Sequence, residues 1–133
     1  MTLFLDSSAL VKRYLGEPAS AIVLREMDRD LDWTASALAL AETRRAICRA
    51  ALASDAEETL QHELRLDWSA FFVLGIDQEL VERASQISCS NGTRTLDSLH
   101  IAAAERLPGP LTFLTFDERQ AAAARSLGFT VVP

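Results

Sequence analysis

Apolar and polar residues alternate in blocks along the chain, and these blocks predict strands separated by helices. Short apolar runs predict buried strands at residues 3–5, 71–74, 111–116 and 130–132, with a shorter strand around Trp33 and Thr34. Segments with helical spacing predict helices at residues 8–15, 19–27, 37–53, 56–66, 79–88, 96–107 and 118–127. Because parallel strands need crossover helices between them, this order predicts an α/β fold with three layers, a mostly parallel central sheet flanked by helices.

The two consecutive helices within residues 37–66 predict a helical hairpin. Its break is expected near Ser54 and Asp55, where either side chain could cap the second helix. The hairpin carries enough apolar surface to pack on the sheet and to leave some for a partner chain, and both uses stay open for Leu38, Leu40, Ile47, Leu52, Leu60 and Leu64.

Length and composition predict one domain spanning residues 1–133. The chain has 49% hydrophobic and 24% charged residues, and a chain of this length buries roughly two thirds of its unfolded surface without help from disulfides or metals. Cys48 and Cys89 lie far apart in the sequence, which fits a reducing cytoplasm. No apolar stretch approaches the roughly 18 residues of a membrane span, and the N-terminus lacks the pattern of a signal peptide. We therefore expect a cytoplasmic protein without membrane contact.

The net charge of −6, from 19 acidic and 13 basic residues, would on average repel nucleic acid. Any RNA binding is therefore expected to be local. Lys12 is the single lysine, so most positive charge is arginine, which suits bidentate contacts to phosphate or to the carboxylates of a partner.

Two aspartates follow predicted strands and precede predicted helices. Asp6 comes directly after the strand at 3–5, and Asp117 directly after the strand at 111–116. The carboxyl ends of parallel strands share one edge of a sheet, where ligands bind, so both side chains are expected at that edge. Aspartate is also a common N-cap, and a capping role for each stays open.

Two further acids stand on predicted helix faces that are otherwise apolar. Glu42 follows five apolar residues, and Asp97 lies one turn before Ile101. A lone carboxylate in apolar surroundings is costly unless it is paired, protonated or bound to metal. Glu42 has Arg45, and more distantly Arg49, as an alternative partner, whereas Asp97 has only Arg94 nearby.

Four carboxylates converging at one edge would repel one another, and a hard divalent cation such as Mg²⁺ or Mn²⁺ is the usual remedy. One or two such ions could lower the pKa of a water to make a hydroxide nucleophile and neutralise the charge that develops on a phosphodiester. The acidic set therefore predicts nuclease chemistry.

The four acids occur in segments that together resemble the PIN domains of VapC toxins, and the match spans nearly the whole chain. The segments are residues 5–12 (LDSSALVK), 41–46 (AETRRA), 96–102 (LDSLHIA) and 114–119 (LTFDER), in that order. This resemblance implies a Mg²⁺- or Mn²⁺-dependent endoribonuclease that is usually a homodimer and is held inactive by a cognate VapB antitoxin.

The resemblance also implies roles for particular residues. The four acidic positions of the family match Asp6, Glu42, Asp97 and Asp117, with Ser7 and Thr115 as hydrogen-bonding supports. Asp6 and Asp97 are expected to bind metal most directly. Glu42 would orient or deprotonate the attacking water or hold a second ion, and Asp117 would act through water or only cap its helix.

Other polar and aromatic residues carry weaker expectations. We expect His100 to be a structural histidine rather than a metal ligand, and His62 to lie at the surface. Trp33, Trp68 and Phe72 are expected to pack rather than to stack on bases. Several basic residues could guide RNA, meet an acidic antitoxin segment or simply face solvent, namely Lys12, Arg13, Arg44, Arg45 and Arg49.

Three other functions deserve comparison. A phosphatase of the haloacid-dehalogenase type would need a second aspartate two positions after Asp6, where the chain has Ser8. A phospho-accepting receiver domain would need a late lysine, but the single lysine is Lys12. A non-catalytic acidic α/β domain that binds a partner remains the main alternative, and it would tolerate Asp6→Asn and Asp97→Asn.

Overall fold

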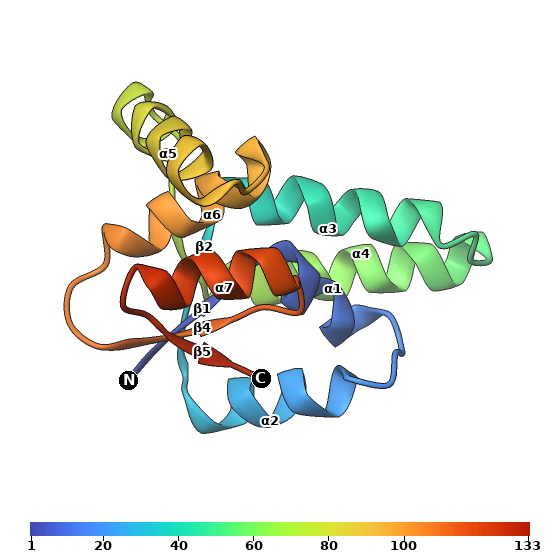
Figure 1. Ribbon diagram of the computed structural model, residues 1–133. Coiled ribbons are helices and arrows are strands. Elements are labelled where there is room, and N and C mark those ends of the chain that lie inside the picture. The colour runs from blue at the N-terminus through green and yellow to red at the C-terminus, as the bar shows by residue number, and fades with distance from the viewer.

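The computed structural model describes residues 1–133 and contains one parallel sheet of five strands between two groups of helices (Figure 1). The strand order is β3-β2-β1-β4-β5, and the predicted three-layer α/β fold is confirmed. The strands are β1 (Thr2–Leu5), β2 (Asp32–Ser36), β3 (Phe72–Leu74), β4 (Leu111–Leu114) and β5 (Thr130–Val132). The helices are α1 (Ser7–Tyr14), α2 (Ser20–Arg29), α3 (Ala37–Arg49), α4 (Ser54–Trp68), α5 (Gln78–Asn91), α6 (Thr95–Glu105) and α7 (Glu118–Ser126). None of the helices is both long and apolar enough to span a membrane.

Alternate residues of the central strand β1 face opposite sides of the sheet, and each side has its own apolar core. Leu3 and Leu5 pack with residues of α1, α2, α3 and α4, whereas Phe4 packs with residues of α5, α6 and α7. All three side chains are fully buried. A parallel sheet covered on both faces explains why its strands are continuous apolar runs in the sequence.

The register of the sheet brings the ends of β1 and β4 to the same level. Leu5 pairs with Leu114, and the backbone N–H of Asp6 donates to the Leu114 carbonyl at 3.3 Å. Asp6 and Thr115, which follow these strands, therefore emerge side by side at the carboxyl edge. Ser36 ends the other neighbour, β2, at this same edge.

The strand predicted at 111–116 is too long, because β4 ends at Leu114. Two backbone N–H groups beyond it bond to side chains instead of to a strand. The N–H of Phe116 donates to Ser8 Oγ at 2.9 Å, and that of Asp117 donates to Thr115 Oγ1 at 3.1 Å. Asp117 consequently lies three residues beyond the strand rather than directly after it.

The helical hairpin exists, but its turn differs from the prediction. α3 ends at Arg49 instead of residue 53, and Ala51 adopts a left-handed conformation with φ of 55°, which cannot continue a right-handed helix. α4 begins at Ser54, and neither predicted side chain caps it, since Ala53 is the N-cap. The other predicted helix ends agree with the structure to within three residues.

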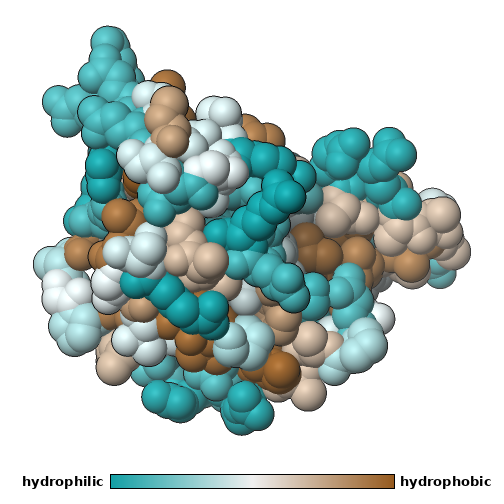
Figure 2. Space-filling view, in the orientation of Figure 1, coloured by the Kyte–Doolittle hydropathy of each residue, from teal (hydrophilic) through white to brown (hydrophobic).

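In Figure 1 the α3–α4 pair extends away from the sheet as an arm. Ile47 and Leu64 are fully buried, and Leu40 and Leu60 pack against the same core, so most of the apolar surface of the hairpin belongs to the core. Leu66 is 59% exposed. Figure 2 shows hydrophobic and hydrophilic surface interspersed along this arm.

The strand predicted at 71–74 is an edge strand, and it is only partly buried. Phe71 is 8% exposed and packs between Trp33 and Trp68, which confirms the packing role of both tryptophans. The same prediction was wrong for Phe72, which is 63% exposed. β3 has a single neighbour in the sheet, so the side chain of Phe72 lacks covering elements.

Candidate active site

The four predicted acids line one open cavity at the carboxyl edge of the sheet, with a volume of about 470 Å³. They come from four separate segments: Asp6 from the end of β1, Glu42 from α3, Asp97 from α6 and Asp117 from the start of α7. Ser7 and three basic residues also line the cavity, namely Lys12, Arg45 and Arg94. The convergence expected from the sequence is therefore present.

Asp6 is the deepest of the four acids, with 1% of its surface exposed. It is the N-cap of α1, and its Oδ1 accepts from the Ala9 N–H at 3.0 Å and from Ser8 Oγ at 2.7 Å. Thr115 Oγ1 donates to the other oxygen, Oδ2. Burial raises the pKa of the Asp6 carboxyl, and the hydrogen bonds from Thr115 and Ser8 offset only part of that rise.

Two hydroxyl groups tie Asp6 to the segment after β4. Thr115 donates to Asp6 and accepts from the N–H of Asp117 at 3.1 Å, so it supports both aspartates, as the family resemblance implied. Ser8 donates to Asp6 and accepts from the N–H of Phe116 at 2.9 Å. From the sequence, Ser8 mattered only as the position where a phosphatase would need a second aspartate. Its spacing of two residues from Asp6 is nevertheless typical of local side-chain hydrogen bonding.

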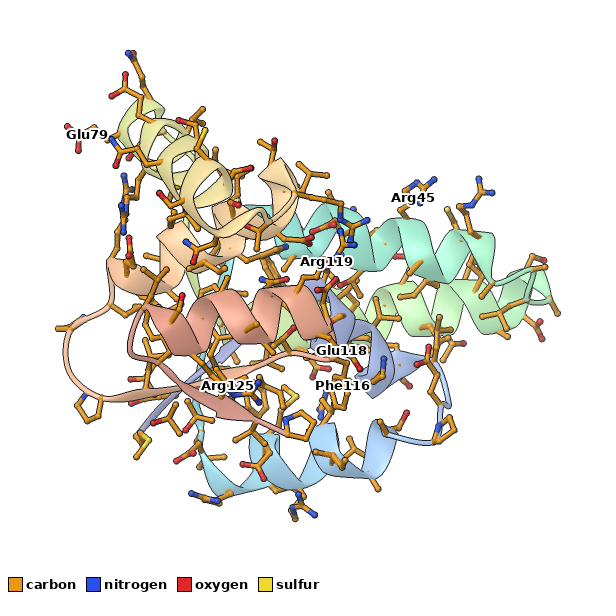
Figure 3. All side chains as sticks on the ribbon, viewed as in Figure 1. Arg45, Glu79, Phe116, Glu118, Arg119 and Arg125 are labelled. Atoms are coloured by element: carbon orange, nitrogen blue, oxygen red, sulfur yellow. The ribbon has the colours of Figure 1, made fainter.

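Glu42 contacts a serine and a histidine rather than the arginine expected from helix spacing. Its Oε1 accepts from Ser7 Oγ at 3.0 Å and lies 2.7 Å from His100 Nε2. Burial alone would raise the pKa of Glu42, but the hydrogen bonds and charge interaction from His100 and Ser7 hold it below its usual value. Arg45, one turn on, makes no ion pair with Glu42 and extends outward from α3 (Figure 3).

His100 is 1% exposed and bonds at both ring nitrogens, as expected for a structural histidine. Its Nδ1 lies 3.0 Å from Ser36 Oγ at the end of β2, and its Nε2 contacts Glu42. It therefore belongs to the site through Glu42, a role that the sequence did not indicate. Its position one turn after Asp97 on α6 predicts a place near the site, but not the contact with Glu42. His62 is exposed, as expected.

Asp97 and Asp117 share one arginine. Arg94 Nε donates to Asp97 Oδ2 at 3.0 Å, and Arg94 Nη2 donates to Asp117 Oδ2 at 3.4 Å. The Asp97 side chain is 16% exposed and that of Asp117 is 26% exposed. Asp117 also caps α7, because its Oδ1 accepts from the Gln120 N–H at 2.9 Å, so capping and a place in the site occur together. Asp6 combines the same two roles.

The remaining basic residues differ in how firmly they are held. Lys12 Nζ pairs with Glu17 at 3.0 Å and lies over the Phe116 ring at 4.6 Å. Arg13 points to a different neighbour, since its Nε donates to Asp67 at 2.9 Å. Arg44, Arg45 and Arg49 are exposed along α3.

The chemistry of the donor set suits a hard divalent cation, because the cavity offers four carboxylates and no thiol. No three acidic, histidine or cysteine side chains stand close enough together to hold an ion as arranged. Arg94 occupies one oxygen of Asp97 and one of Asp117. An ion at this site would therefore need water ligands or a shift of these side chains, together with the buried carboxylate of Asp6.

Known proteins share both the sequence pattern and the fold. Ribonuclease VapC46 of Mycobacterium tuberculosis is 34% identical over 131 residues, which cover 98% of this chain and 95% of that protein. The crystal structure of VapC20 from the same organism, a sarcin-ricin loop cleaving toxin, matches with a TM-score of 0.76 and 19% identity over 97% of each chain. A toxin–antitoxin complex from Klebsiella pneumoniae matches with a TM-score of 0.73 and 17% identity, over 100% of this chain and 97% of that one.

The model of the PIN domain family matches residues 3–126, which include all four acids and both supporting hydroxyls. The structural neighbours below 25% identity bear on the fold alone, whereas the family model and the 34% identical ribonuclease bear on the sequence itself. The chain therefore belongs to the PIN-domain family, within the group of VapC ribonucleases.

Proposed function

We propose that this protein is a metal-dependent endoribonuclease that hydrolyses RNA phosphodiesters in the acidic cavity and acts as the toxin of a toxin–antitoxin pair. One observation carries the proposal: carboxylates from four separate segments meet in a single open cavity, in a chain of the VapC ribonuclease group. Such a gathering is costly for stability, which favours a functional reason for it.

Mg²⁺ or Mn²⁺ is the proposed cofactor, held by Asp6 and Asp97 with Glu42 and Asp117 nearby. When bound, such an ion would supply a more acidic water and positive charge for the transition state. The residues themselves have distinct tasks. Despite partial burial, hydrogen bonds and charge interaction from His100 and Ser7 hold the pKa of Glu42 below its usual value, so the carboxylate is ionised at neutral pH and is suited to orient the attacking water or to hold a second ion. Ser7 and His100 hold that carboxylate in place, and Thr115 does the same for Asp6.

The proposed partners are RNA, a VapB-type antitoxin and a second copy of the chain. The complex from Klebsiella pneumoniae is a toxin–antitoxin complex, which supports an antitoxin partner for a chain of the same fold. Exposed Arg44, Arg45 and Arg49 on α3 are suited to RNA phosphates or to acidic groups of the antitoxin. We expect these encounters in the cytoplasm, where the two exposed cysteines would stay reduced.

The alternative functions fit the site less well. A haloacid-dehalogenase-like phosphatase needs a carboxylic acid where this chain has Ser8, whose hydroxyl is already bonded to Asp6 and to the Phe116 N–H. A receiver domain needs a free lysine, but Lys12 is paired with Glu17. A non-catalytic partner-binding domain would have no use for four carboxylates that converge in a cavity.

The test is to incubate purified protein, free of antitoxin, with total RNA while Mg²⁺ or Mn²⁺ is titrated. EDTA and Asp97→Asn should each abolish cleavage, whereas the matched control Asp28→Asn, an exposed aspartate on α2, should leave it intact. Discrete fragments that require both metal and Asp97 would establish the nuclease. Unchanged cleavage by Asp97→Asn, or no cleavage of any RNA with either metal, would favour the partner-binding domain.

A further inference from the structure

The backbone of Arg94 is held by hydrogen bonds, whereas its side chain is largely exposed to solvent. It is the N-cap of α6, and its carbonyl accepts from both the N–H and the hydroxyl of Ser98, each at 2.9 Å. Ser98 is fully buried and is bonded in turn to buried Thr93. The Arg94 side chain, by contrast, is 72% exposed. The guanidinium can therefore move while its attachment point at the mouth of the cavity stays in place.

The guanidinium occupies one oxygen of each of two aspartates that a metal ion could otherwise bind directly. Asp117 Oδ1 is committed to the Gln120 N–H, so Oδ2 is the oxygen left for a ligand, and Arg94 Nη2 takes it. Arg94 Nε takes Oδ2 of Asp97 in the same way. A cation bound directly to Oδ2 of either aspartate would lie against the positive charge of the guanidinium, so such binding favours release of Arg94.

The two ion pairs of Arg94 are weak enough to be broken when a metal ion competes for the same carboxylates. Pairs with an exposed partner are screened by water and contribute little. A divalent ion offers twice the charge and sits closer to the oxygens. Arg94 also has one group, Nη1, with no hydrogen bond in the structure. The cavity has three basic residues. Lys12 pairs with Glu17 and Arg45 forms no ion pair with the site acids, whereas Arg94 pairs with Asp97 and Asp117.

We propose that Arg94 is an exchangeable cation of the active site: it neutralises Asp97 and Asp117 when metal is absent, gives them up when metal binds, and then holds an RNA phosphate beside the cleaved bond. The inference deepens the proposed function and rests on its metal site. Once released, the guanidinium presents a planar set of donors suited to a phosphate in two-point contact. Leu96, 51% exposed and lining the same cavity, would flank the sugar or base of that nucleotide.

The first measurement is the affinity for Mn²⁺ alone, by calorimetric titration of the whole chain without RNA. Arg94→Ala should bind Mn²⁺ roughly threefold to tenfold more tightly than the parent protein, as expected when a competing exposed ion pair is lost. Arg119→Ala is the matched control, since Arg119 is exposed in the first turn of α7 and pairs with none of the site acids (Figure 3). Arg94→Lys, which keeps a mobile cation, should stay near the parent value.

The second measurement is the binding of a labelled, mixed-sequence, single-stranded RNA oligonucleotide, followed by fluorescence anisotropy. Cleavage is prevented by Glu42→Gln, and this background is first titrated with Mn²⁺ so that RNA binding is compared only where the ion is bound. Arg94→Ala should weaken RNA binding in Mn²⁺ and have little effect in EDTA. The slope of log affinity against log salt should fall by about 0.7, the value for one phosphate contact to a single strand.

Each outcome is decisive. Unchanged Mn²⁺ affinity in Arg94→Ala, or an equal gain in Arg119→Ala, would overturn the exchange, and an equal effect on RNA binding with and without Mn²⁺ would overturn the phosphate contact. If the parent protein and Asp97→Asn both fail to bind Mn²⁺, the metal site of the proposed function is wrong and the inference falls with it. If only Asp97→Asn fails to bind, the metal site stands and the Arg94 variants decide the inference alone.

Discussion

His100 Nε2 lies 2.7 Å from Glu42 Oε1, which joins a fully buried imidazole on α6 to a half-buried carboxylate on α3. The other ring nitrogen lies 3.0 Å from Ser36 Oγ at the end of β2. The orientation of Glu42 is therefore set by the packed interior, through a buried ring that is bonded at both nitrogens. Ser7 fixes the same oxygen from α1.

Removing the nitrogens of His100 should slow cleavage without removing any acid. We expect His100→Phe, which keeps a ring of similar size, to lower kcat roughly 10- to 100-fold, the usual effect of losing a partner that orients an active-site ligand. His100→Gln, which retains a donor, should recover part of the rate. The measurement is RNA cleavage at saturating metal, with exposed His62→Gln as control. A full rate in folded His100→Phe would show that Glu42 does not need this partner.

The hydroxyl of Thr115 should matter for the stability of the fold. Thr115→Val keeps the shape of the side chain but removes the donor to Asp6 and the acceptor of the Asp117 N–H. We expect the free energy of unfolding to fall by about 1–2 kcal/mol, because buried polar groups lose their partners. Urea denaturation would measure this against Thr112→Val, a buried threonine on β4 whose hydroxyl contacts only the Met1 sulfur. Equal losses in the two variants would contradict a special role for Thr115.

The sequence predicted the fold and the four acids because both depend on local patterns. They depend also on the rule that the carboxyl ends of parallel strands share one edge of the sheet, where ligands bind. Apolar runs such as residues 3–5 are continuous because the sheet is covered on both faces. Asp6 could be placed from the end of its strand alone. Glu42 and Asp97 stood out because they interrupt apolar helix faces.

What the sequence could not provide was the pairing of side chains across elements. Arg45 is one turn from Glu42 and looked like its partner, yet His100, 58 residues away, holds that position. Helix spacing places Arg94 beside Asp97 alone, but its side chain also reaches Asp117, 23 residues on. Such contacts depend on how α3, α6 and α7 pack around the sheet. The exposure of Phe72 likewise depends on β3 being the edge strand.

Because Asp6 is buried, the stability of the metal-free protein is expected to decrease as the pH rises. Its folded-state pKa lies above the usual value of 3.8, so the folded protein binds this proton more tightly than the unfolded chain does. Stability from this group is thus full below the usual pKa and is lost as pH rises through the raised pKa. At neutral pH and without metal, Asp6→Asn should therefore raise Tm, because asparagine keeps an oxygen to cap α1 but carries no buried charge.

This gain should shrink as the pH is lowered, because the carboxyl of the parent protein then becomes protonated. Added Mg²⁺ should stabilise the parent protein and leave Asp6→Asn unchanged, since a ligand that binds only the folded state raises Tm. Scanning calorimetry between acidic and neutral pH, with and without Mg²⁺, measures both effects. A lower Tm for Asp6→Asn at neutral pH would mean that the hydrogen bonds of the carboxylate outweigh its burial.

Asp67 connects α4 to α1 away from the acidic cavity, and a single tyrosine reports on that connection. Its Oδ2 accepts from Arg13 Nε at 2.9 Å and from Tyr14 Oη at 2.8 Å. Burial raises the pKa of Tyr14, and the hydrogen bond to Asp67 raises it further. Asp67→Ala should therefore let Tyr14 ionise at lower pH and cost roughly 1–3 kcal/mol of unfolding free energy, because a buried hydroxyl loses its acceptor.

Tyr14 is the only tyrosine in the chain, so the absorbance change of tyrosinate on raising the pH follows this one group. Glu63→Ala is the matched control, because Glu63 is an exposed acid on the same helix that has no hydrogen bond to Tyr14. Burial remains in Asp67→Ala, so the pKa of Tyr14 should fall but stay above the ordinary value of 10.0. If Asp67→Ala and Glu63→Ala titrate alike, the Tyr14 pKa is set by burial, and the hydrogen bond to Asp67 makes no contribution to it.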